Sequence, residues 1–173
     1  MDLIEKSLKN SPLFSKLNNE EIKIVAKKFE KNLVKTGKAI VVEGELSSYI
    51  YILLRGTAKV STRLEHYEIF LCSMEPASLI GEITLIDKGP ISADVVASGA
   101  CLVGRITHQQ IEEIMELYPA IASKIWEGIA RVLSSRIRKS NEMMRNYSGI
   151  NKAICDNSDF REFFSFCYYS PKE

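Results

Sequence analysis

The chain has 173 residues, of which 46% are hydrophobic and 26% are charged, and its formal net charge is +1. This length predicts one domain with appendages, and the composition is that of a globular protein. The balanced charge excludes an overall basic, nucleic-acid-coating surface and an acidic tail, so charge indicates no partner.

The four cysteines are scattered, without a C-x-x-C pair, and the N-terminal MDLIEKSLKN contains no secretory apolar segment. They are Cys72, Cys101, Cys155 and Cys167. We therefore expect reduced thiols that fill the core of a cytoplasmic protein. No apolar run approaches the roughly 20 residues that cross a bilayer, so no membrane insertion is expected.

Residues 1–30 are expected to form two helices, separated at Pro12. Asn18 can cap the second helix, with Glu21 as its capping-box partner. Apolar residues then recur at helical spacing and predict a face that packs on the domain body. They are Ile22, Val25, Ala26 and Phe29.

Residues 31–107 consist of short β-rich runs punctuated by glycine. The runs are AIVVEGE, SYIYILLRG, TAKVSTRL, YEIFLCS, ADVVAS and CLVGRIT. Short strands at regular spacing predict a roll or barrel. Seven of the nine glycines are expected at or near the ends of runs, where turns favour glycine: Gly37, Gly44, Gly56, Gly81, Gly89, Gly99 and Gly104.

Residues 108–147 return to a helical pattern, which Pro119 divides into a short helix and a long one. The long helix has apolar residues at three-to-four spacing: Ile121, Ile125, Ile129, Val132, Leu133, Ile137 and Met144. A helix longer than the domain on which it packs usually finds a second apolar surface. We therefore predict a homodimer formed through residues 119–147.

Residues 148–173 form a tail in which six aromatic side chains crowd into ten positions: Phe160, Phe163, Phe164, Phe166, Tyr168 and Tyr169. A tail of this kind is expected to dock rather than to remain in water. Its own domain, a partner subunit and another protein are all open as the docking surface.

Three blocks, in order, are GKAI with GE at residues 37–45, YIYILLRG at 49–56 and GEITLI at 81–86. They resemble the cyclic-nucleotide-binding domain family of the catabolite activator protein and kinase regulatory-subunit type. The resemblance implies an α+β, mainly β fold: a β-roll or jelly roll of about eight strands, with N-terminal helices and a long C-terminal helix.

The phosphate-binding cassette of this family is a short helix in a loop between strands, and residues 81–93 resemble it. The resemblance places Gly81, Glu82, Ile83 and Thr84 at the ligand, expected to be cAMP or cGMP. Glycine lets the backbone approach the ligand, and amides at a helix N-terminus favour a phosphate. Gly81 and Ile83 are therefore expected at the phosphate, and Glu82 at the ribose 2′-hydroxyl.

Ile91 stands where the family has an arginine, ten positions after the cassette glycine. An arginine fork supplies charge-assisted hydrogen bonds of roughly 1.5–3 kcal/mol each, so its loss is expected to weaken binding about ten- to a hundredfold or more. Ser92 can still donate its hydroxyl to the phosphate. Lys88 offers a point charge on a flexible stem, which does not reproduce the guanidinium fork.

In the dimeric bacterial transcription factors of this family, the long helix presents hydroxyl groups to the base, and Ser134 and Ser135 occupy a similar stretch. The alternative is that both serines are solvated or bonded to their own backbone. Those factors continue into a winged helix-turn-helix, whereas the segment after Tyr147 has no two-helix pattern with a polar recognition helix. A stand-alone module without direct DNA binding is expected.

Catalysis and metal binding are not expected either. His66 and His108 lie far apart, without zinc-ligand spacing, and no nucleophile with a base and no paired-carboxylate motif is evident. The leading hypothesis is a non-catalytic sensor that couples the cassette to the dimer helix. The alternative is a degenerate fold that binds no nucleotide and acts as a structural or protein-interaction module, whose aromatic tail docks a partner or fills the cavity itself.

Overall fold

The computed structural model describes residues 1–65, 67–148 and 162. The chain divides into two compact units, Met1–Arg131 and Val132–Glu173. All the strands described below belong to the first unit. The six aromatic residues of the predicted tail lie outside the described residues, so its docking stays a prediction.

The described strands pair antiparallel in two four-stranded sheets. The first sheet has the order β1 (Glu30–Val34), β8 (Cys101–Thr107), β3 (Tyr49–Arg55) and β6 (Leu79–Ile80). The second has the order β2 (Ala39–Val41), β7 (Asp94–Ala97), β4 (Ala58–Leu64) and β5 (Tyr67–Met74). The predicted β-roll of about eight strands is confirmed.

Side chains from both sheets meet in the core, because alternate positions of the strands carry apolar residues. One cluster consists of Val34, Leu53, Ala97, Cys101 and Val103. A second consists of Val41, Ala58, Ile80, Ile91 and Val95, and it reaches the segment that precedes β7. The core therefore extends directly to the predicted cassette.

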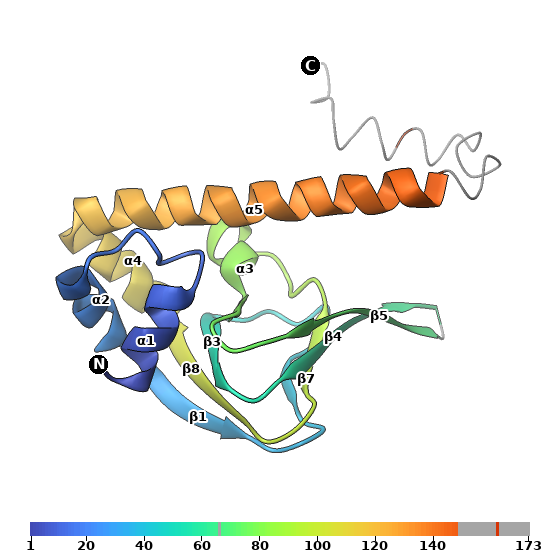
Figure 1. Cartoon of the computed structure of the whole chain (residues 1–173), viewed down its shortest axis with the longest axis horizontal. Helices are drawn as coiled ribbons and strands as arrows, with labels where there is room; N and C mark the ends of the chain where they lie inside the picture. Colours follow the sequence, from blue (N-terminus) through green and yellow to red (C-terminus); the bar gives the residue numbers. More distant parts are fainter. Residues whose placement is uncertain (66, 149–161, 163–173) are drawn as a thin grey trace. The chain divides into compact units, whose positions relative to one another are not determined.

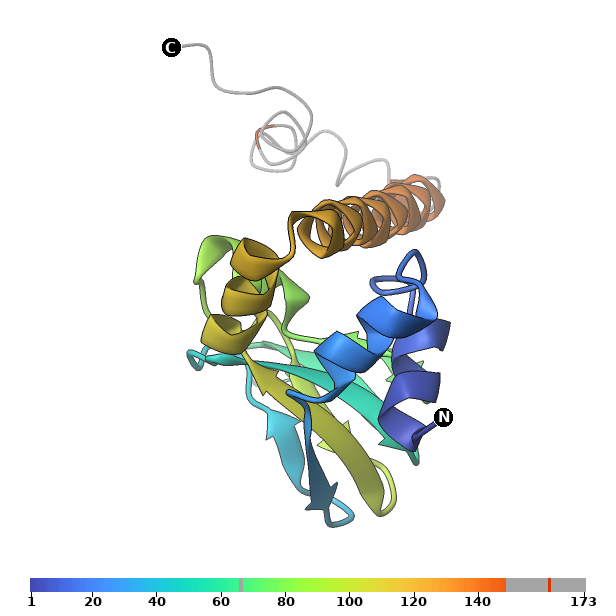
Figure 2. The same cartoon turned by 90° about the vertical axis from the view of Figure 1, so that its left-hand side faces the viewer.

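Helices α1 (Leu3–Asn10), α2 (Asn19–Ala26) and α4 (His108–Leu117) gather at one end of the roll, as Figures 1 and 2 show. The predicted capping box begins α2: Asn18 Oδ1 accepts from the amide of Glu21, and Glu21 Oε2 accepts from the amide of Asn18 at 2.7 Å. The Glu21 carboxylate also accepts from Lys124 Nζ at 2.7 Å. Lys124 belongs to α5 (Pro119–Ser148), so this ion pair joins α2 to the start of the long helix.

Helix α5 runs from Pro119 to Ser148. Ile121, Ile125 and Ile129 are buried in the first unit, whereas Ile137 and Met143 are exposed on the later turns. The apolar stripe predicted for dimerisation therefore begins as part of the chain's own core. None of the described helices combines the length and apolar character needed to cross a bilayer.

Two expectations about single residues are wrong. Gly104 lies in the middle of β8 rather than at a turn, where a Cβ atom would come within 3.1 Å of Ile52 Cγ2. Close packing against β3, not backbone conformation, favours glycine there. Cys101 is buried, as expected of a core residue, but Cys72 is exposed on the edge strand β5.

Candidate ligand-binding site

The predicted cassette connects β6 to β7 and contains the short helix α3 (Glu82–Asp87). Gly81 precedes the helix in the left-handed conformation, with φ of 84°. A Cβ atom there would lie 2.8 Å from the backbone oxygen of Tyr49 in β3. Both the positive φ and the close approach require glycine at the residue that precedes α3.

Glu82 and Ile83 form the first turn of α3, whose amides have no partner within the helix itself. The side chain of Glu82 is buried, with 1% of the residue exposed, and Ile83 is half-buried. The buried carboxylate can accept a hydrogen bond from a hydroxyl group, and the neighbouring helix amides can donate hydrogen bonds to an anion. This is the chemistry that the resemblance assigned to Gly81, Glu82 and Ile83.

Thr84 is directed into the protein. Its hydroxyl donates to the carbonyl of Gly81 at 2.9 Å and lies 3.2 Å from Nε2 of His108, the first residue of α4. Thr84 is 2% exposed and His108 is 7% exposed. Thr84 was predicted at the ligand, and in this structure its hydroxyl holds the cassette turn.

Ile91 packs its side chain into the apolar cluster with Val41, Ile80 and Val95. Its amide donates to the carbonyl of Glu45 at 2.8 Å, and its carbonyl accepts from the amide of Gly44 at 2.8 Å. The position at which the resemblance predicts an arginine is therefore occupied by a residue of the hydrocarbon core. Ser92 follows it and is exposed, so its hydroxyl is accessible to a ligand.

Lys88, the nearest cation in the sequence, ends α3 in the left-handed conformation and forms an ion pair with Glu112 of α4. Burial, and then the charge of Lys88, lower the pKa of His108, while Glu112 and the backbone of Tyr49 act in the opposite direction. The cassette helix thus contacts α4 at two points, one near each end.

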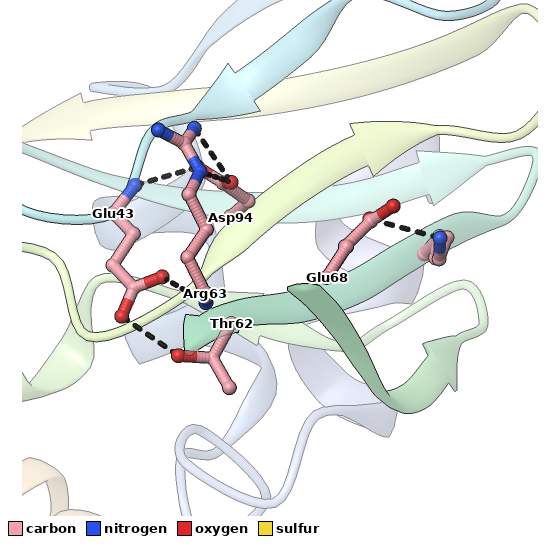
Figure 3. A network of polar contacts seen from close by, with 6 residues as sticks. Glu43, Thr62, Arg63, Glu68 and Asp94 are labelled. Carbon is pink, nitrogen blue, oxygen red and sulfur yellow. Dashed lines mark hydrogen bonds and ion pairs between the residues drawn. The ribbon is translucent and has the colours of Figure 1, made fainter. Parts of the chain in front are cut away.

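A second cation, Arg63 of β4, lies near the other end of the cassette. Figure 3 shows its guanidinium facing the carboxylate of Asp94, the first residue of β7, with Nε and an Nη at 3.0 and 2.8 Å from Oδ2. Glu43 completes the network: its amide donates to Asp94, and its carboxylate accepts from the hydroxyl of Thr62 and the amide of Arg63. Arg63 is therefore neutralised by Asp94, and the network ties Glu43, which follows β2, to β4 and β7.

An open pocket of about 270 Å³ lies beside the cassette helix. Its lining comes from α3, α4 and the first turns of α5: Leu85, Glu112, Met115, Glu116, Ala122 and Trp126. Trp126 is 48% exposed. The pocket brings the cassette helix and the start of the long helix to one surface.

Ser134 and Ser135, predicted to reach the base, are exposed on α5 in the second unit. Their contact with a ligand stays a prediction. His108, Asp94 and Glu43 were not predicted from the sequence, because their partners are 19 to 51 positions away in the chain. Only the capping signal Thr107–Gln110, which fixes the start of α4 and hence the place of His108, was available in the sequence.

Comparisons with known proteins identify the family of the chain. Residues 31–118 match the cyclic nucleotide-binding domain family, and the chain belongs to this family. It is 28% identical over 135 residues to the cyclic AMP receptor protein of Thermus thermophilus, and 30% identical over 98 residues to a cAMP-dependent protein kinase regulatory subunit of Mycosarcoma maydis. These matches cover 78% and 57% of this chain, but 61% and 19% of the two relatives.

Solved structures confirm the fold. The Thermus thermophilus catabolite activator protein superposes with a TM-score of 0.71 at 27% identity, over 80% of this chain and 63% of that one. A cyclic nucleotide-binding domain from Methylobacillus flagellatus has a TM-score of 0.75 at 20% identity and is similar in fold, over 84% of this chain and 82% of the other. The chain thus spans less than two thirds of the length of the cyclic AMP receptor protein, of the kinase regulatory subunit and of the catabolite activator protein.

Proposed function

We propose that this chain is a non-catalytic regulatory module, in which the cassette binds cAMP or cGMP and α5 transmits the bound state. The observation that carries the proposal is the cassette itself, where a left-handed Gly81 begins α3 and Glu82 is buried beside it. Two relatives whose names refer to cAMP support a cyclic nucleotide as the ligand.

In this proposal the amides of Gly81 and Ile83 and the hydroxyl of Ser92 bind the phosphate, and Glu82 accepts from the ribose 2′-hydroxyl. Ile91 provides no charge, and Lys88 and Arg63 are engaged by Glu112 and Asp94. Binding should therefore be weaker than with an arginine clamp, by about ten- to a hundredfold.

Transmission to α5 is supported by the pocket that Leu85, Met115 and Trp126 share, because a movement of α3 changes the surface on which α5 begins. The later turns carry the exposed Ile137 and Met143, which suit a homodimer contact within residues 119–147. A ligand shifts this helix only if it binds one helix arrangement better than the other.

A second candidate function is favoured by the burial of Ile91, which is 6% exposed within an apolar cluster. A roll interior filled with hydrocarbon at the expected phosphate clamp suits a module that binds no nucleotide. In that case the fold serves as an interaction domain, and regulation comes from a protein partner.

Calorimetric titration of the full chain with cAMP and with cGMP separates the two functions. The sensor predicts micromolar binding of at least one nucleotide. Absence of heat up to millimolar nucleotide, with the protein folded, contradicts the sensor and leaves the interaction module.

Two matched variants locate the binding. Glu82→Gln removes the buried carboxylate with little change of shape, and it should weaken binding at least tenfold because the ribose hydroxyl loses a charged acceptor. Glu75→Gln makes the same change at an exposed position and should leave the affinity unaltered. Equal affinities of the two variants would place the nucleotide elsewhere.

A further inference from the structure

His108 is a buried imidazole that reaches the cassette through one hydroxyl group. Its amide donates to the carbonyl of Ser48 at 2.8 Å, which fixes the start of α4 beside β3. Its Nε2 lies 3.2 Å from Thr84 Oγ1, and the same oxygen lies 2.9 Å from the carbonyl of Gly81. The ring is therefore two hydrogen bonds away from the residue that begins the cassette.

The number of protons available limits which of these contacts form together. A hydroxyl has one proton, so Thr84 donates either to His108 Nε2 or to the Gly81 carbonyl. A neutral imidazole has one N–H, and the ring also faces a backbone acceptor at Tyr49. The imidazolium has two N–H groups, so it satisfies both Tyr49 and Thr84 and leaves the Thr84 proton for Gly81.

We propose that His108 is a positioning residue of the cassette, and that its protonation decides whether Thr84 directs its hydroxyl proton to α4 or to the Gly81 carbonyl. The peptide that carries this carbonyl also carries the amide of Glu82, so the contact sets the direction of the first donors of α3. The consequence for a ligand rests on the proposed function.

Two charged side chains near the ring act on its protonation in opposite directions. Lys88 at the end of α3 repels an imidazolium, and Glu112 on α4 attracts it. The ion pair between these two residues keeps both next to the ring. Burial together with Lys88 prevails and lowers the pKa of His108, so the neutral form predominates at neutral pH.

An anion bound at the first turn of α3 adds a negative charge one residue away from Thr84 and favours the imidazolium. Linkage is reciprocal, so an anionic ligand should raise the pKa of His108, and acidification should strengthen the binding of that ligand. An uncharged contact to the cassette would not produce this coupling.

Nuclear magnetic resonance of the full chain tests the proposal without any ligand. The sequence has two histidines, so the variant His66→Gln leaves His108 as the only imidazole. Between about pH 5 and pH 8 we expect the ring signals and the amide signals of Glu82 and Ile83 to titrate with one common midpoint. The proposal would be overturned if the amide signals of Glu82 and Ile83 did not titrate with the midpoint of the ring.

Variants of Thr84 in the same background distinguish the hydroxyl relay from simple proximity. In Thr84→Val the ring signals should still titrate, but the amide signals of the cassette should no longer change with pH at the same midpoint. Thr84→Ser keeps the hydroxyl and should restore the common midpoint. Thr36→Val makes the same change at an exposed position and should alter neither signal. Continued following in a folded Thr84→Val variant would contradict the relay.

Addition of cAMP distinguishes this proposal from the proposed function. If cAMP shifts the cassette signals, the His108 midpoint should move to higher pH, and an unchanged or lowered midpoint overturns the coupling. If cAMP changes no signal, the nucleotide function fails, while a common midpoint of ring and amides still supports the positioning role.

Discussion

At the scale of single residues, Ile91 occupies the position at which the resemblance to the family predicts an arginine. Its side chain belongs to an apolar cluster, so the position of the expected phosphate clamp is part of the core. Stability and ligand affinity are therefore expected to change together when this residue is replaced.

Ile91→Arg should lower the free energy of unfolding by about 3 kcal/mol, because an unpaired charge enters an apolar cluster. A bound cyclic phosphate would pair with the new guanidinium, so saturating cAMP should stabilise this variant more than the parent. Urea unfolding with and without cAMP measures both effects. Ile91→Met, which conserves volume and adds no charge, should cost less than about 1.5 kcal/mol and leave the response to cAMP unchanged. Equal stabilisation of the arginine variant and the parent would show that the guanidinium does not reach the ligand.

His108 makes a separate prediction about pH. Burial and Lys88 lower its pKa in the folded state, so on acidification the unfolded chain takes up the proton first. The stability that neutral His108 contributes is complete above its ordinary value near pH 6.5 and is lost as pH falls toward the lowered pKa. Carboxyl groups such as Glu21, whose pKa the hydrogen bond from Lys124 lowers from 4.5, act at lower pH.

Urea unfolding at about pH 7.5 and pH 5.5 should therefore show a loss of stability on acidification that is smaller in His108→Gln than in the parent. The comparison concerns the change between the two pH values, since the substitution also removes the contact with Thr84 at every pH. His66→Gln serves as the matched control and should keep the pH response of the parent. A response that survives in His108→Gln would assign the pH dependence to other groups.

At the scale of elements, the strands that contain a run rich in β-branched, aromatic and other apolar residues were predictable, whereas β1 and β6 were not. Five residues make up β1, of which only Val34 is buried, so the strand lacks an apolar alternation. Strand β6 has two residues, and its pairing with β3 rather than its own sequence defines it. In both cases the partner strand supplies the information.

The cassette shows the same division. Gly81 and the helix after it were predictable, because glycine and a helix start leave local signals. The partners of Thr84, Lys88 and Asp94 were not, because tertiary packing brings them from α4 and β4. Tertiary packing also explains why glycine occupies position 104 within β8.

Gly128 illustrates a tertiary requirement in α5. A Cβ atom there would lie 2.1 Å from the backbone oxygen of Leu13, so α5 meets the segment between α1 and α2 at a glycine. Alanine favours helix by about 1 kcal/mol over glycine, but relieving a clash with backbone requires the two segments to separate.

Gly128→Ala should therefore lower the free energy of unfolding, by about 1–3 kcal/mol, despite the better helix propensity. Thermal and urea unfolding measure the change. Gly99→Ala, at a site where an added Cβ meets nothing within 4 Å, is the control and should cause no loss. A Gly128→Ala variant as stable as the parent would show that α5 does not require this close contact.

At the scale of the whole molecule, the proposed regulatory function requires coupling between the cassette and α5. The first turns of α5 are buried in the same unit as the cassette, and its later turns expose Ile137 and Met143. A helix anchored at its start and apolar farther along can carry a change at the cassette to a second copy of the chain. The fold alone does not require this coupling, since the same arrangement also suits a domain that binds only protein.

Sedimentation equilibrium of the full chain, with and without saturating cAMP, tests this coupling most directly. We expect a monomer–dimer equilibrium whose dissociation constant cAMP changes at least about fivefold, since a coupling free energy of about 1–3 kcal/mol is typical of linked sites. Glu82→Gln should show the same dimerisation without the response to cAMP. A parent chain that binds cAMP with an unchanged dimer dissociation constant, or that remains monomeric at every concentration, would contradict the account.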